Sequence, residues 1–165
     1  MMWKCVKLAG LFIVATLCHW GIATLFSYAG FNVNVMLIFA VAFCAVLNLE
    51  WGYPLAFLCG LFLDFFGTKL FGNNAFLFTM TACVIYFLKE RIDFGSPFTQ
   101  MLTIFILTCT ISLLNTVLLV WFASSLLWPG FWSWLGSAVV GALLSPVVFW
   151  LVGRAWNTAD SKATI

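Results

Sequence analysis

Four residues recur at four-residue intervals in one apolar stretch: Gly52, Ala56, Gly60 and Asp64. In a helix this spacing places them on one face, where small side chains let another backbone approach closely. A carboxylate near the edge of the hydrocarbon is costly unless it has a partner. Asp64 can therefore accept hydrogen bonds from free N–H groups at the start of a following helix, or hold a proton or cation in a transport path. Because the sequence offers no second acid at the same depth for a relay, we expect the structural role.

Polar residues near the ends of the neighbouring apolar stretches are the candidate partners of Asp64. We expect them to gather at the outer side of the membrane, where an asparagine amide or a lysine ammonium can reach a carboxylate. They are Asn32, Asn34, Lys69, Asn73 and Asn74.

A second small-residue face is predicted near the end of the chain. Ser137, Gly141 and Ser145 repeat at four-residue spacing and Pro146 follows, which indicates another close-packing face with a kink. The pattern does not decide whether this face meets the same chain or another one. The preceding stretch is unusually polar and predicts an interior or partner-facing stripe, made by Thr108, Thr110, Ser112, Asn115 and Thr116.

No residue pattern indicates catalysis, a metal site or a cofactor. There is no plausible Ser, His and acid combination at a shared depth, no pair of carboxylates at one membrane level and no Gly-rich phosphate loop. The six cysteines fall mostly inside apolar runs without a CxxC pair, so we expect small buried hydrophobes. His19 is open to three readings, a pH-sensitive switch, a metal ligand or a hydrogen-bonded packing residue, and we expect the last.

The elements that must position these residues are membrane helices. The chain has 165 residues, of which 65% are hydrophobic and 7% charged, and its mean hydropathy is +1.14. That leaves too little polar surface to cover a water-soluble protein, and a net charge of +2 is too small for a nucleic-acid partner. We predict one all-α membrane domain, a polytopic bundle of about six transmembrane helices, over residues 8–28, 33–49, 52–66, 74–88, 101–126 and 131–153.

The distribution of cations predicts the orientation of this bundle. Six crossings put all Lys and Arg residues except Lys69 on one side, so both termini are expected in the cytoplasm and the first stretch is expected to be an uncleaved span. The third and fourth stretches are short and are expected to tilt, to extend into their loops or to form a re-entrant hairpin. The inner loop over residues 89–93 has balanced charge, so we expect a solvated turn rather than a clamp for lipid headgroups, or a contact with a cytoplasmic partner.

One segment also resembles a known family. The run from Gly60 to Phe66, with Asp64 inside it and Gly72 following, resembles the most recognisable stretch of the rod shape-determining protein MreD family, although Phe71 stands where that family usually has Leu. The resemblance implies a non-catalytic scaffold in the inner membrane of a bacterium, in the cell-elongation complex that builds peptidoglycan. Its implied partners are MreC, MreB, RodA and the elongation transpeptidase, besides membrane lipid.

The same family is similar in fold to the S components of energy-coupling-factor transporters. This similarity supplies the alternative of a substrate-binding subunit that captures a vitamin-like molecule at the outer face. A capture subunit should show more hydrogen-bonding groups converging at that face than this chain has, so the scaffold is the preferred hypothesis. A small proton-coupled exporter is a third class with little support in the sequence.

Overall fold

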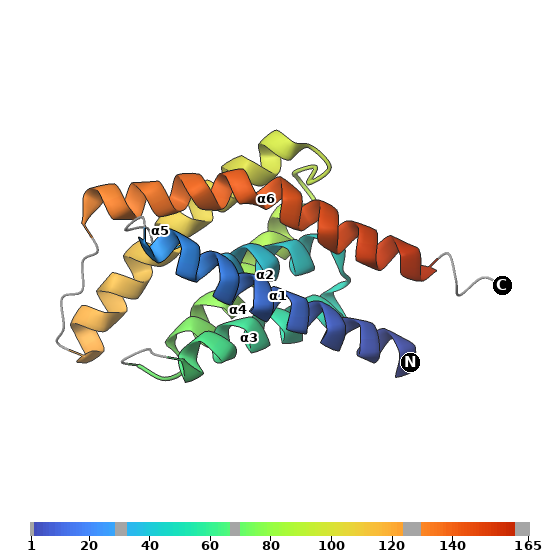
Figure 1. Cartoon of the computed structure of the whole chain (residues 1–165), viewed down its shortest axis with the longest axis horizontal. Helices are drawn as coiled ribbons and strands as arrows, with labels where there is room; N and C mark the ends of the chain where they lie inside the picture. Colours follow the sequence, from blue (N-terminus) through green and yellow to red (C-terminus); the bar gives the residue numbers. More distant parts are fainter. Residues whose placement is uncertain (1, 29–32, 67–69, 124–129, 161–165) are drawn as a thin grey trace.

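The computed structural model describes residues 2–28, 33–66, 70–123 and 130–160, and all regular structure in these ranges is helical. The all-α prediction is therefore confirmed. The start of the first helix and the end of the last helix lie at the same end of the molecule (Figure 1). The helices are α1 (Met2–Tyr28), α2 (Val35–Val46), α3 (Leu49–Phe65), α4 (Asn73–Lys89), α5 (Pro97–Ala123) and α6 (Phe131–Asp160).

The helices fall into a long and a short group. Three of them are long and apolar enough to cross a membrane, over Val6–Phe26 in α1, Pro97–Phe122 in α5 and Phe131–Trp156 in α6. By contrast, α2 has 12 residues, and α3 and α4 have 17 residues each. At 1.5 Å per residue the short helices are about 18 to 25 Å long, less than the ~30 Å of a hydrocarbon core.

Several helix boundaries differ from the predicted spans for local reasons. The backbone of Leu47 is extended, with φ −86° and ψ 163°, so α2 stops before this residue and α3 starts at Leu49 rather than Gly52. Pro97 opens α5 four residues earlier than predicted, because the fixed φ of proline suits the first helical position. The carbonyl of Ser96 accepts the first bond of that helix from the Gln100 N–H at 3.2 Å.

The centre of the molecule is α2. Its residues from Val35 to Cys44 are all buried, and it contacts each of the other five helices. An apolar run without a polar face suits this position, because every side of the helix packs against protein. The Asn34 side chain begins the helix by accepting a hydrogen bond from the Leu37 N–H at 3.2 Å.

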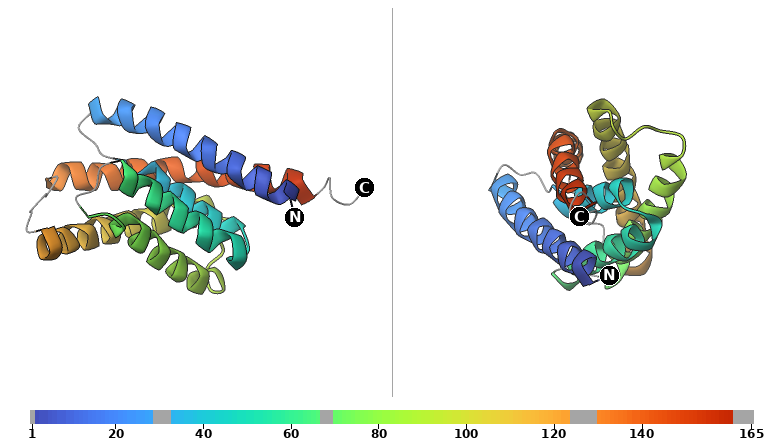
Figure 2. Two further views of the ribbon diagram at one scale, coloured as in Figure 1. Left: turned by 90° about the horizontal axis from the view of Figure 1, so that it is seen from below. Right: turned by 90° about the vertical axis from the view of Figure 1, so that its right-hand side faces the viewer.

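The long helix α1 lies along one side of this core (Figure 2). It meets α3 and its C-cap residue through edge-to-face ring contacts, Phe12 with Phe62 at 6.0 Å and Trp20 with Phe66 at 5.7 Å between centroids. Large apolar side chains on its other faces, such as Leu17, stay exposed. Exposed apolar side chains also cover parts of α5 and α6, which suits helices that contact lipid.

Candidate functional site

The face formed by Gly52, Ala56, Gly60 and Asp64 is buried and turned towards α4. A Cβ atom at Gly60 would lie 2.5 Å from the carbonyl oxygen of Asn74 and 2.6 Å from the Cα atom of Ala75. Both contacts are with backbone, which cannot rotate away. At Gly52 an added Cβ would overlap the hydroxyl of Tyr86. The spacing of small residues therefore serves the contact between α3 and α4 within this chain.

Asp64 closes that face by capping α4. Its Oδ1 atom accepts a hydrogen bond from the N–H of Asn74 and its Oδ2 atom accepts one from the N–H of Ala75, each at 3.0 Å. The side chain is only 5% exposed. This is the structural arrangement that the sequence predicts for Asp64, with a carboxylate at the positive end of a helix dipole.

The start of α4 needs such a partner because its own N-cap residue is a glycine. Gly72 adopts a left-handed backbone with φ 89°, and it has no side chain that could bond to the free N–H groups of the first turn. Asn74 and Ala75 are the second and third residues of the helix, the positions that a capping side chain normally serves. Asp64 therefore caps α4 from another helix, α3. Usually a serine or aspartate at the helix's own N-cap position provides this cap.

The predicted outer polar residues have separate roles. Asn34 caps α2, and Asn74 contributes its backbone N–H to Asp64. The Asn73 side chain, which is 8% exposed, donates from Nδ2 to the Oδ1 atom of Asn115 in α5. Two further predicted candidates, Asn32 and Lys69, lie outside the described residues.

The second small-residue face packs within this chain. A Cβ atom at Gly141 would lie 3.9 Å from side-chain atoms of Ile38 in α2 and of Ile104 and Thr108 in α5, which is ordinary contact. Ser145 is fully buried and Ser137 partly buried, and each hydroxyl donates to a carbonyl of its own helix. The face therefore joins α6 to α5 and α2.

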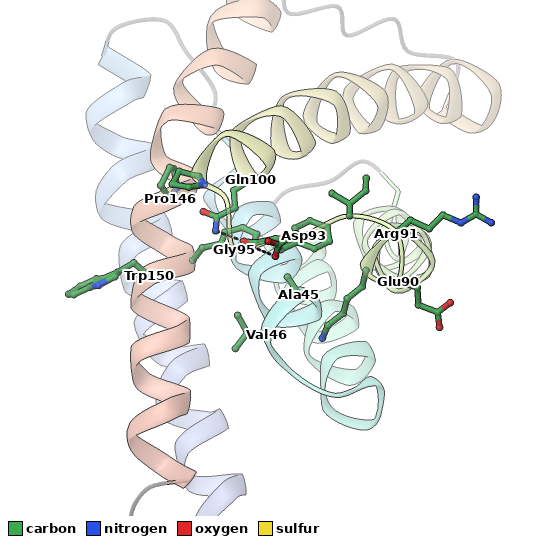
Figure 3. A pocket seen from close by; sticks show the side chains of 14 residues that line it. Ala45, Val46, Glu90, Arg91, Asp93, Gly95, Gln100, Pro146 and Trp150 are labelled. Carbon is green, nitrogen blue, oxygen red and sulfur yellow. Dashed lines mark hydrogen bonds between the residues drawn. The ribbon is translucent and has the colours of Figure 1, made fainter.

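A cavity of about 950 Å³ opens at the end of the short helices, between the last residues of α2, the loop from α4 to α5, and α6 (Figure 3). Its residues come from three separate parts of the chain, so no single sequence motif marks it. They are Ala45, Val46, Lys89, Glu90, Arg91, Ile92, Asp93, Phe94, Gly95, Pro97, Gln100, Pro146, Phe149 and Trp150. We call this cavity the inner groove, because the sequence predicts that its loop lies on the inner side of the membrane.

Several polar side chains of the inner groove are held in place by the backbone. Lys89 donates from Nζ to the carbonyl of Leu47 at 3.1 Å, and Gln100 donates from Nε2 to the carbonyl of Phe94 at 2.6 Å. Asp93 accepts the Gly95 N–H at 2.8 Å. Partial burial lowers the pKa of the Lys89 ammonium, so an anion beside it would favour the charged form.

Groups that could hold a metal ion, counted as three or more neighbouring His, Cys, Asp or Glu side chains, do not occur among the described residues. His19 has a buried Nδ1 atom without a hydrogen-bond partner in the described part of the chain, so the hydrogen bond expected of it is not formed by that atom. The polar atoms described above take part in helix capping and helix packing.

The fold and these contacts define an all-helical protein with three helices suited to crossing a membrane. Comparison with protein-family models, curated proteins and solved structures finds no match for the chain. Its function is therefore inferred from its residues and their geometry.

Proposed function

We propose that this protein is a non-catalytic scaffold subunit of the bacterial cell-elongation complex. In this proposal all six helices are inserted in the cytoplasmic membrane with both termini in the cytoplasm. The subunit binds MreC, and through it joins MreB, RodA and the elongation transpeptidase at sites of peptidoglycan synthesis. Its contribution is to hold partners in place, without a reaction of its own.

The proposal rests on the contacts of Gly60 and Asp64, the glycine and the aspartate of the segment that resembles the MreD family. Gly60 admits the backbone of α4, and Asp64 bonds to two N–H groups at the start of that helix. Both bonds fix the Asp64 carboxylate to the start of α4. A fixed carboxylate fits a rigid hairpin better than a transport path. A rigid hairpin is what a scaffold needs, because binding a partner then costs little ordering entropy.

Surfaces for a single-span partner are available on the long helices. Leu17 and Leu25 of α1 are 68% and 70% exposed, and Trp121 of α5 is 80% exposed. In a bilayer such apolar faces contact lipid or another helix, and the choice depends on packing rather than on hydrophobicity. MreC has one membrane span, and a single span is the type of partner that can pack against these faces.

The proposal is tested by purifying the tagged protein from its native membrane in mild detergent and identifying the proteins that co-purify. Recovery of MreC with elongation enzymes supports the scaffold. Recovery of a pair of transporter ATPases instead would replace it with the substrate-capture subunit. Quantifying MreC with Gly60→Ala and with Gly141→Ala, at equal amounts of folded protein, then shows whether partner binding depends on the α3–α4 hairpin.

A further inference from the structure

The inner groove has an apolar back and a polar front. Ala45 and Val46 from the end of α2, with Pro146 and Phe149 from α6, form the apolar part, while the loop after α4 brings charged side chains. A volume of about 950 Å³ lies within the range of sites that enclose a small organic ligand. The groove is thus shaped for a ligand with both an apolar and an ionic part.

The charges of the groove are of both signs, and they are not neutralised by each other. Among the described residues neither Lys89 nor Arg91 forms an ion pair with a carboxylate, although Glu90 and Asp93 are close in sequence. Figure 3 shows the side chains of Glu90 and Arg91 directed away from α6, whereas Asp93 lies on the side of the loop that faces it. Lys89 and Asp93 are therefore the cation and the anion that a ligand in the groove would meet.

The groove lies at the level expected for lipid headgroups. It is bounded by the last residue of α4, Lys89, and the first residue of α5, Pro97. On its α6 side Trp150 is 63% exposed, and the Arg154 guanidinium lies over the indole at 5.5 Å from the ring centroid. Exposed tryptophan with arginine beside it is typical of the boundary between hydrocarbon and headgroups. Because Trp150 also lines the groove, the groove reaches the lipid-facing surface of α6.

We propose that the inner groove binds the headgroup of an aminophospholipid, a lipid whose phosphate anion and primary ammonium lie on one headgroup. The phosphate pairs with the Lys89 ammonium and the lipid ammonium pairs with the Asp93 carboxylate. Two of the three Lys89 N–H donors remain available after the bond to Leu47, and Asp93 keeps acceptor capacity beyond its bond to Gly95. The lipid chains leave along Trp150. A headgroup that carries only negative charge would place no cation beside the Asp93 carboxylate.

This site does not depend on the scaffold function, and retained lipid tests it directly. The purified protein is equilibrated with phosphatidylethanolamine, phosphatidylglycerol or phosphatidylcholine of the same acyl chains, and bound lipid is counted by native mass spectrometry. We expect phosphatidylethanolamine to be retained about fivefold more than phosphatidylglycerol, the factor given by ~1 kcal/mol per ionic contact at a membrane surface, and also more than phosphatidylcholine. Phosphatidylcholine lacks N–H donors, so it separates hydrogen bonding to Asp93 from simple charge.

Two pairs of variants on the same loop locate the site. Lys89→Gln should lower the retention of all three lipids, and Asp93→Asn should remove the preference for phosphatidylethanolamine, while Glu90→Gln and Arg91→Gln, which change lining side chains directed away from α6, should have smaller effects. Glutamine keeps an N–H donor on a shorter side chain and asparagine can still accept from Gly95, and unfolding temperatures will check that the fold persists. Equal retention of the three lipids by the wild type, or an equal effect of the outward-facing pair, would overturn the proposal.

Discussion

Gly60 of α3 and Ala75 of α4 are packed so closely that a single added carbon at position 60 would lie 2.6 Å from the Ala75 Cα atom. The same approach brings the Ala75 N–H within 3.0 Å of the Asp64 carboxylate, one turn further along α3. Close packing and capping are thus two results of one helix contact. A substitution at position 60 should disturb both, because moving α4 outwards also lengthens the bonds to Asp64.

Two buried glycines provide a matched test of this contact. Replacing glycine by alanine inside a helix favours the helix by about 1 kcal/mol at either site. At Gly60 the new methyl meets backbone, so we expect a net loss of about 2 kcal/mol or more. At Gly141 the nearest atoms are 3.9 Å away, so we expect no loss. Thermal unfolding in detergent measures both, and equal behaviour of the two variants would contradict the packing account.

Substitutions of Asp64 separate capping from ion binding. Asp64→Ala removes both acceptors and should cost about 2 kcal/mol, since each lost cap bond is worth ~1 kcal/mol. Asp64→Asn keeps one acceptor oxygen and should cost about half as much. Stability is read from thermal unfolding and function from recovery of the partner complex. Complete loss of function in a stable Asp64→Asn variant would show that the charge itself is needed, as in a proton or cation site.

The contact of α3 with α4 could be predicted from the sequence because its signal is local. Helical periodicity alone puts Gly52, Ala56, Gly60 and Asp64 on one face, and the next helix along the chain is the natural partner. Short-range geometry of this kind does not depend on the rest of the bundle. The missing cap of α4 was not predicted, because the expected span began at Asn74, whereas the helix begins at Asn73 with Gly72 at its N-cap position.

The central place of α2 and the inner groove could not be predicted in the same way. An apolar run of 12 residues fits a buried helix as well as part of a span, and only the packing of the other helices decides between them. The groove joins Val46, Asp93 and Trp150, which are far apart in the sequence and carry no common pattern. The balanced charge of its loop predicts a solvated turn rather than a clamp for lipid headgroups, and the sequence does not show which of these charges face α6.

The left-handed backbone of Gly72 should be sensitive to substitution although space around it is open. Apart from its chain neighbours, no atom of the described residues lies within 4 Å of a Cβ built at Gly72, so the cost of Gly72→Ala comes from its φ of 89° and should be about 1 kcal/mol. Asparagine tolerates this conformation better, so Gly72→Asn should cost less. Thermal unfolding of both variants tests the order. If alanine is tolerated as well as asparagine, the start of α4 does not need the left-handed turn.

The pair formed by Asn73 and Asn115 should couple α4 to α5. Each single change to leucine leaves the other amide without its partner at a partly buried place, whereas the double change removes both amides together. We therefore expect the double variant to lose about 1 kcal/mol less stability than the two single variants lose together. This coupling is near the upper range for hydrogen bonds between membrane helices. A double-mutant cycle from thermal unfolding measures this coupling. Additive losses would mean that the two amides act independently and that α5 is held to α4 by apolar packing alone.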